Sequence, residues 1–206
     1  MAVTSYKFFG TIVSQTISGG NSTDWLNPSN AGADDTSYAT LGLTTASSDV
    51  GAYLNFQNPG FVSGDLQASP TIDGIEMEGG AFEGAATDNV FNLNFRSIKG
   101  GSINASNVSG LDTTTEFGTT PVTIFTFGGA TNLMQNTWTG TDITSSSFGA
   151  AWSQNCTGTT PDVSVDYLKV RIYNTAGGGG GGHLFLMSNL DGLSTCGPKQ
   201  YNGMQY

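Results

Sequence analysis

The stretch Asn89–Ile98, NVFNLNFRSI, alternates apolar and polar side chains more regularly than any other part of the chain. An alternation with a period of two is the pattern of a β-strand with one buried face. The side chains expected to point into a core are Phe91, Leu93 and Phe95, and those expected to point away are Asn92, Asn94 and Arg96. The stretch therefore predicts a half-buried strand.

A second stretch, Val163–Tyr173 (VSVDYLKVRIY), is longer and rich in β-branched residues. Strict alternation places Val163, Val165, Tyr167, Lys169, Arg171 and Tyr173 on one face, and Asp166, Leu168, Val170 and Ile172 on the other. Because both faces carry apolar residues, we expect this strand to lie in the middle of a sheet.

Shorter runs of the same kind recur between turn signals. They are Tyr6–Ile17, Tyr38–Leu43, Ala52–Phe56, Thr71–Glu78 and Val122–Phe127. On Thr71–Glu78, strict alternation places Ile72 on the face of Glu76 and Glu78, and the Gly- and Ala-rich segment 79–88 is expected to be a loop. No window shows a convincing 3.6-residue period with helix caps, so the sequence predicts an all-β antiparallel sandwich.

The chain has 206 residues, enough for one substantial domain, and carries 6 basic against 16 acidic side chains, a net charge of −10. Nucleic acid and anionic membranes both require a cationic surface, so neither is an expected partner. There is no apolar run of the length a membrane helix needs. The first residues do not have the pattern of a secretory signal, which predicts synthesis in a cytoplasm.

Six consecutive glycines, Gly177–Gly182, mark a boundary. They predict three parts: an N-terminal strand or arm at 1–22, the sandwich at 23–174, and a linker with a docking tail at 175–206. The tail contains a compact apolar run of Leu184, Phe185, Leu186 and Met187. We expect this run to dock on a neighbouring surface, and the alternative is a tail that folds back on its own domain.

Few residues point to chemistry. Asp34, Asp35, Asp162 and Asp166 could supply oxygens to Ca²⁺, but they lack the spacing of an EF-hand, so no metal or other cofactor is predicted. Glu76 and Glu78 share one strand face, which is more typical of a solvated face than of the paired acids of a glycosidase. His183 is the only histidine and follows the glycine linker, a poor place for a preorganised triad. We therefore expect no enzymatic activity.

The three tryptophans, Trp25, Trp138 and Trp152, could form a platform for stacking sugars, but packing in the core is the favoured interpretation. Cys156 and Cys196 are separated by 40 positions. We expect them to be free thiols in a reducing compartment. The alternative is a Cys156–Cys196 disulfide that forms late and holds the tail in place.

Several short motifs follow one another in order between residues 23 and 174. They are Trp25–Ala31 (WLNPSNA), Asp34–Thr40 (DDTSYAT), Ile72–Glu78 (IDGIEME), Trp138–Thr144 (WTGTDIT), Phe148–Gly149 and Val165–Tyr173 (VDYLKVRIY). This succession resembles a recurrent β-sandwich module of tailed-phage virion proteins and phage-derived genes. The resemblance implies a jelly-roll sandwich in which Trp25 and Trp138 are packing residues. Segment 79–90 departs from the pattern, and 175–206 lies beyond it.

The resemblance makes a virion structural protein the leading expectation. We expect a capsid decoration (cement) protein, assembled as a homotrimer, that bridges major capsid protein subunits in the virion after synthesis in the host cytoplasm. Exchanged extensions such as the arm and the tail would add contact area without enlarging the core. One alternative is a tail fibre or receptor-binding protein that touches a host surface glycan. The other, from a different class, is a carbohydrate-binding module.

Overall fold

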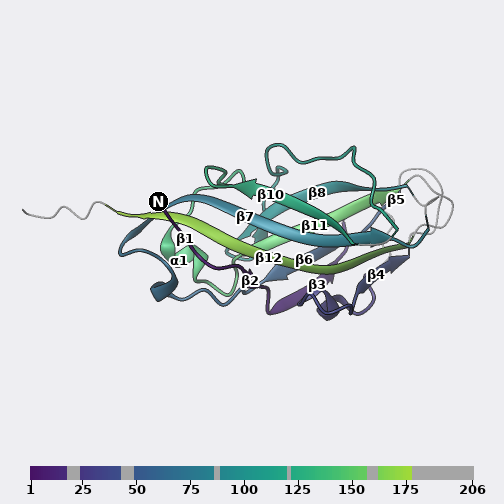
Figure 1. Ribbon diagram of the computed structural model, residues 1–206, viewed down its shortest axis with the longest axis horizontal. Helices are drawn as coiled ribbons and strands as arrows, with labels where there is room; N and C mark the ends of the chain where they lie inside the picture. The colour runs from purple at the N-terminus through teal and green to yellow at the C-terminus, as the bar shows by residue number, and fades with distance from the viewer. Residues whose placement is uncertain (18–23, 43–48, 86–88, 120–121, 157–161, 178–206) are drawn as a thin grey trace, which may run out of the picture.

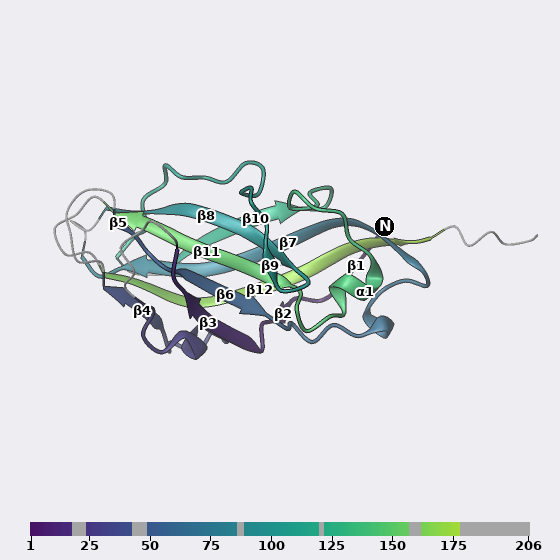
Figure 2. The same cartoon turned by 180° about the vertical axis from the view of Figure 1, so that it is seen from behind.

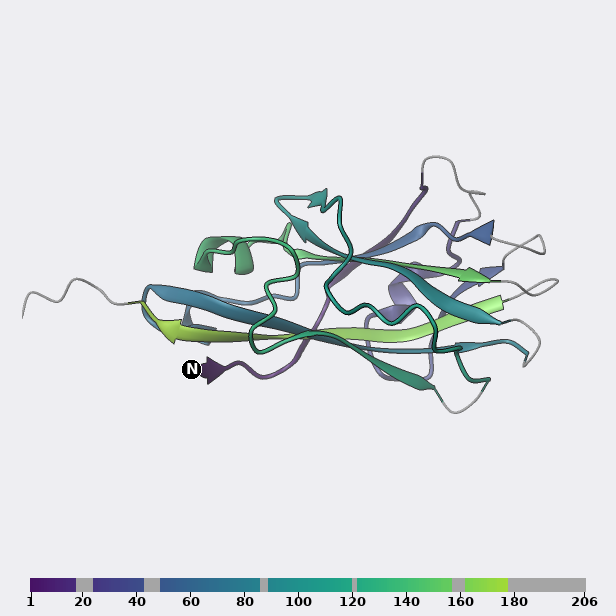
Figure 3. The same cartoon turned by 90° about the horizontal axis from the view of Figure 1, so that it is seen from above.

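A computed structural model describes residues 1–17, 24–42, 49–85, 89–119, 122–156 and 162–177. Two antiparallel sheets face one another, as Figure 3 shows. Sheet I contains β1 (Ala2–Val3), β2 (Lys7–Phe8), β4 (Ala39–Gly42), β7 (Pro70–Glu83), β10 (Thr123–Gly129) and β12 (Asp162–Ala176). Sheet II contains β3 (Thr11–Gln15), β5 (Asp49–Val50), β6 (Tyr53–Gln57), β8 (Val90–Lys99), β9 (Ser102–Ile103) and β11 (Gly149–Cys156). The predicted all-β, jelly-roll-like sandwich is confirmed.

Helical structure in the described residues is short. It consists of two single-turn 3₁₀ segments, η1 (Pro28–Ala31) and η2 (Ser63–Asp65), and the helix α1 (Gly140–Ile143). Thr139 caps α1 by accepting a hydrogen bond from the backbone N–H of Asp142, and the Asp142 carboxylate accepts one from the N–H of Thr139 in return. No helix among the described residues is long and apolar enough to cross a membrane.

Strand β12 is central, as its two apolar faces predict. It pairs with β7 along one side, and with β1, β2 and β4 along the other. In sheet II, β11 lies between β6 and β8. Figure 1 shows β7, β10 and β12 running along the length of the molecule, and Figure 2 shows β6, β8 and β11 from behind.

Aromatic side chains fill the middle of the core. Trp152 is fully buried and its ring contacts four phenylalanine rings edge-on or tilted, those of Phe95, Phe117, Phe125 and Phe127. Phe95 and Phe127, from opposite sheets, stack with their ring planes 10° apart. Burial of such large rings supplies much of the free energy that stabilises a sandwich.

Three β-bulges overturn the strict alternation expected from the sequence. In each bulge, one strand has an extra residue that has no partner in the paired strand. The extra residues are Leu93 in β8, Asp73 in β7 and Asp166 in β12. A bulge moves every later side chain to the other face. In β8, Val90 and Asn92 therefore point into the core before the bulge, and Phe95 points into it after the bulge. Phe91 and Leu93, expected inside, are only half-buried and lie outside the core cluster.

The other two bulges correct the faces of β7 and β12 in the same way. Ile72 lies in the core with Ile75, not on the face of Glu76 and Glu78. Val163 and Val165 are buried in the core together with Leu168, although the bulge at Asp166 separates them. A two-residue period cannot describe a strand that contains an extra residue.

The loop expected at 79–88 is also wrong in its first half, because β7 continues to Glu83. Gly79 and Gly80 lie within β7. Large rings occupy the space that a side chain at either position would need. A Cβ on Gly79 would lie 2.9 Å from the Trp152 ring, and one on Gly80 would lie 2.8 Å from the Tyr167 ring. These glycines are sites of close packing rather than of chain reversal.

The first fifteen residues contribute to both sheets. β1 and β2 pair with β12 in sheet I, and β3 pairs with β6 in sheet II. The division into arm, sandwich and tail stays a prediction. Leu184, Phe185, Leu186 and Met187 lie outside the described residues, as do His183 and Cys196.

Candidate functional site

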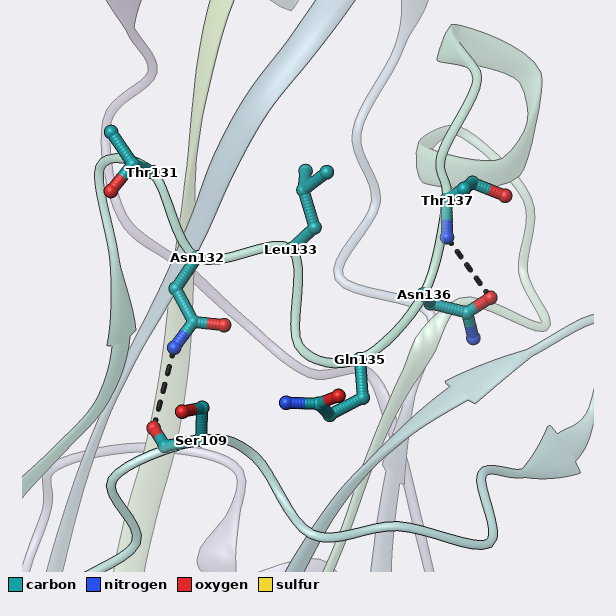
Figure 4. A pocket seen from close by; sticks show the side chains of 7 residues that line it. All are labelled: Ser109, Thr131, Asn132, Leu133, Gln135, Asn136 and Thr137. Atoms are coloured by element: carbon teal, nitrogen blue, oxygen red, sulfur yellow. Dashed lines mark hydrogen bonds between the residues drawn. The ribbon is translucent and has the colours of Figure 1, made fainter.

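A pocket lies on the loop that follows β10. It has a volume of about 720 Å³ and opens to solvent (Figure 4). Its lining residues are Ser109, Thr131, Asn132, Leu133, Gln135, Asn136 and Thr137. We call it the loop pocket. Figure 4 shows the side chains of Asn132 and Gln135 lying on the same side as Ser109.

Asn132 attaches this loop to the rest of the fold. Its backbone carbonyl accepts a hydrogen bond from the N–H of Ile75 in β7, 2.9 Å away. Its side-chain oxygen accepts one from the N–H of Met134 at 2.8 Å, and its side-chain nitrogen lies 3.4 Å from the carbonyl of Ser109. Asn132 therefore joins the two walls of the loop pocket.

Met134 and Gln135 have left-handed backbone conformations, with φ of 51° and 59°. Residues other than glycine adopt this conformation at a cost, and they keep it where their surroundings hold it. Here Met134 is fully buried and its carbonyl accepts a hydrogen bond from the Ser97 hydroxyl at 3.0 Å. The carbonyl of Gln135 accepts one from the Asn104 side chain at 2.8 Å. These contacts turn the Gln135 side chain outward on a fixed backbone.

Trp138 holds the loop against the core. Its indole N–H donates to the carbonyl of Leu133 at 2.8 Å, and its ring packs edge-on against Phe148. The Lys99 ammonium group lies 5.6 Å from the centre of the Trp138 ring and donates to the carbonyl of Thr137. The loop pocket is thus largely formed before any ligand binds.

Every polar group that lines the loop pocket is a hydroxyl, an amide or a backbone group, and none of the lining side chains is ionisable. Ser109, Thr131, Gln135 and Thr137 are exposed, so their side chains are free to meet a ligand. Hydroxyls both donate and accept hydrogen bonds, and a carboxamide presents two donors and one acceptor oxygen. Such a lining suits a neutral ligand with many hydroxyl groups.

Glu76 and Glu78 lie outside the loop pocket, on the outer face of sheet I. Glu76 accepts hydrogen bonds from the hydroxyls of Tyr6 and Tyr173 and pairs with Arg171 at 2.6 Å. Burial raises the pKa of Glu76, but these partners outweigh burial and hold the pKa below its ordinary value.

Glu78 has a similar set of partners. It pairs with Lys169 at 2.7 Å and accepts a hydrogen bond from Tyr167. The ammonium group of Lys169 also lies 4.9 Å from the centre of the Tyr6 ring. The two glutamates therefore attach Tyr6 and the strand β12 to β7, and their partners explain this arrangement without a catalytic role.

The four aspartates considered for Ca²⁺ are partly brought together. Backbone N–H groups of Asp35 and Thr36 donate to the carboxylate of Asp166, whereas Asp162 is exposed at the start of β12. Burial and the charge of Asp34 raise the pKa of Asp166. Among the described residues, no group of three or more His, Cys, Asp or Glu side chains is placed to hold a metal ion.

The three tryptophans are buried, with exposed fractions of 3% for Trp25, 8% for Trp138 and 0% for Trp152. The packing interpretation is therefore confirmed, and a stacking platform built from them is wrong. Trp25 donates its indole N–H to the carbonyl of Ala52 at 2.9 Å.

The loop pocket was not predicted from the sequence. The segment 129–137 reads as a polar turn, and neither Met134 nor Gln135 carries a glycine-like signal for a left-handed backbone. The amides and hydroxyls of this segment gave no signal of their own, because such residues occur throughout the chain.

No family model matches the sequence, and no curated protein matches it. Among solved structures, the chain is similar to the CBM22-1 xylan-binding domain of Paenibacillus barcinonensis Xyn10C, with 11% identity and a TM-score of 0.41, over 85% of this chain and 97% of that one. The tandem CBM22-1–CBM22-2 domain of the same protein gives the same identity and TM-score, over 85% of this chain and 47% of that one.

The N-terminal cellulose-binding domain of Cellulomonas fimi β-1,4-glucanase C is similar at 12% identity and a TM-score of 0.34, over 81% of this chain and 88% of that one. Identities and TM-scores this low do not place the chain in any of these families.

Proposed function

We propose that the protein is a non-catalytic module that binds a neutral glycan in the loop pocket. The chemistry of the lining supports this proposal, since it offers hydroxyls and amides, one leucine and no ionisable side chain. A volume of about 720 Å³ is within the range of small-molecule sites and would hold a few sugar rings.

Two further features favour a neutral ligand and a useful affinity. The net charge of −10 repels anionic ligands, and a lining without charge gives them no compensating cation. The loop is held by the hydrogen bonds of Asn132, Ser97 and Asn104, so little ordering cost opposes binding.

Binding is tested with a glycan array followed by calorimetry on the full chain. We expect Gln135→Gly to lower the affinity for the bound glycan about two- to tenfold, the worth of one or two lost hydrogen bonds. Glycine accepts the left-handed backbone at this position, so the variant should be at least as stable as the parent.

The matched control is Gln67→Gly, which changes an exposed glutamine that does not line the loop pocket. It should bind the glycan like the parent protein. If no neutral glycan binds, or if Gln135→Gly and Gln67→Gly bind equally, the proposal is wrong.

A virion setting stays a prediction from the sequence resemblance, including capsid decoration, bridging of the major capsid protein and a homotrimeric state. Glycan binding fits the fibre or receptor-binding alternative and the carbohydrate-binding alternative better than it fits a cement role. Densitometry of purified particles separates these readings, because a cement protein matches capsid subunits in number, and a fibre is far rarer.

A further inference from the structure

A second pocket lies at the end of the molecule where the described chain leaves the fold. It has a volume of about 410 Å³ and more apolar than polar surface. Its lining residues are Ser63, Leu66, Gln67, Ala68, Ser69, Pro70, Gly140, Thr141 and Thr144. We call it the exit groove. It separates η2 and the start of β7 from α1, all of which lie at the same pole in Figures 1 and 2.

The chain leaves β12 at the wall of this groove. The backbone N–H of Gly177, the last described residue, donates to the carbonyl of Ser69 at 2.9 Å, and Ser69 lines the groove. A Cβ on residue 177 would lie 2.0 Å from that carbonyl, so only glycine permits the contact. The direction in which the tail starts is therefore set beside the exit groove.

Several segments at this pole carry exposed apolar side chains. Val3 pairs with Tyr173 near the end of β12 and is 51% exposed, and Met1 beside it is 69% exposed. Val62, which directly precedes the lining residue Ser63, is 60% exposed. Large exposed apolar side chains next to an apolar groove are typical of a surface that another segment covers.

We propose that Leu184, Phe185, Leu186 and Met187 of the same chain bind in the exit groove. They form the first apolar run after Gly177, and seven residues extend at most about 25 Å, which is ample for a groove that begins at Ser69. The glycines in between allow the chain to reverse without side-chain clashes.

The chemistries of run and groove match. Neither the run nor the groove lining contains a charged side chain, so docking buries no unpaired charge. Leu66 and Pro70 offer apolar contacts, and the hydroxyls of Ser63, Thr141 and Thr144 can meet the backbone of an extended segment. The exit groove and the loop pocket share no lining residue, so this proposal is independent of glycan binding.

A photo-crosslink in the full chain tests the proposal. Phe185 is replaced by p-benzoylphenylalanine, and isotopically labelled and unlabelled copies are mixed before irradiation and mass spectrometry. We expect crosslinks to residues 63–70 or 140–144 that join peptides of one label only. Crosslinks between labels, crosslinks to other surfaces or no crosslink at all would each overturn the proposal.

Groove variants provide the second arm. Ala68→Arg with Thr141→Arg places two charged side chains at exposed positions of the groove and should abolish the crosslink. Ala105→Arg with Thr113→Arg makes the same chemical change at exposed positions elsewhere and should leave it intact. A thermal melt of both double variants confirms that each is folded, and an undiminished crosslink in the groove variant contradicts the proposal.

Discussion

The indole N–H of Trp152 donates to the side-chain oxygen of Asn92 across 2.8 Å in the centre of the sandwich. Trp152 is 0% and Asn92 1% exposed, so no solvent can replace either partner. Asn92 points inward before the bulge at Leu93, and Phe95 points inward after it. The bulge thus lets one strand offer both a polar partner and an aromatic ring to the same tryptophan.

Asn92→Leu should therefore destabilise the fold by about 1–3 kcal/mol, because it leaves a buried indole N–H without an acceptor. Adding Trp152→Phe removes that donor, so the double variant should lose less stability than the sum of the two single variants. Urea unfolding of all three variants measures this coupling. Strict additivity would mean that the hydrogen bond contributes nothing.

Glu76 should make the fold sensitive to acid. Its pKa lies below the ordinary 4.5, because hydrogen bonds from Tyr6, Tyr173 and Arg171 outweigh burial. A carboxyl whose pKa is lower in the folded state stabilises the fold above its unfolded pKa, and this contribution is lost as the pH falls through the folded pKa. Stability should accordingly decline on acidification below 4.5.

Glu76→Gln should cost about 1–2 kcal/mol at neutral pH and much less in acid, because Arg171 loses its anionic partner and the amide offers one acceptor oxygen where the carboxylate offers two. Unfolding measured across the acidic range follows this difference. Glu116→Gln, a change at an exposed glutamate, is the control and should have little effect at either pH. A Glu76→Gln deficit that is the same at every pH would contradict the assignment.

Asp166, unlike Glu76, should lower the stability of the fold at neutral pH. It is 4% exposed, one of its oxygens has no hydrogen-bond partner, and burial together with the charge of Asp34 raises its pKa. A carboxyl with a raised folded pKa destabilises the fold once it ionises, so its cost is present at neutral pH and disappears in acid.

Asp166→Asn should consequently raise the melting temperature at neutral pH and bring no gain in acid. The asparagine oxygen can still accept the N–H groups of Asp35 and Thr36 that now meet the carboxylate. Differential scanning calorimetry at two pH values measures the effect. A variant that melts lower at neutral pH would show that the carboxylate has a favourable partner, such as a cation.

Gly149→Ala should severely destabilise the sandwich, by about 3 kcal/mol or more. Gly149 is the first residue of β11, and a Cβ there would lie 1.9 Å from the carbonyl oxygen of Phe56 in the neighbouring strand. Gly64→Ala is the matched control, since a Cβ there meets nothing within 4 Å. Urea unfolding should leave the control within experimental error of the parent, and equal effects would contradict the steric argument.

The sequence was sufficient for the class of fold and for the central place of β12. Both depend on local composition, since β-branched and alternating segments specify strands wherever they pair. The faces of Ile72, Phe91 and Val165 were misassigned because each bulge is fixed by pairing with a distant strand. At Asp166, for example, the extra residue exists only relative to β7.

The candidate site could not be predicted from the sequence for a related reason. The loop pocket depends on contacts between Asn132 and Ile75 and between Gln135 and Asn104, which join segments far apart in the chain. Hydroxyls and amides also occur throughout this chain, so their presence in segment 129–137 carries no special signal. The buried tryptophans were easier to interpret, because ring size alone favours packing.

The pairing of β1 and β2 with β12 has a consequence for synthesis on the ribosome. Residues 2–8 emerge before the other described strands of sheet I, yet their partner strand is completed only after residue 176 has been added. β7 likewise lacks its longest neighbour until then. Sheet I must therefore assemble after translation of nearly the whole domain, and a ribosome stalled before β12 would present an open strand edge to chaperones or to other nascent chains.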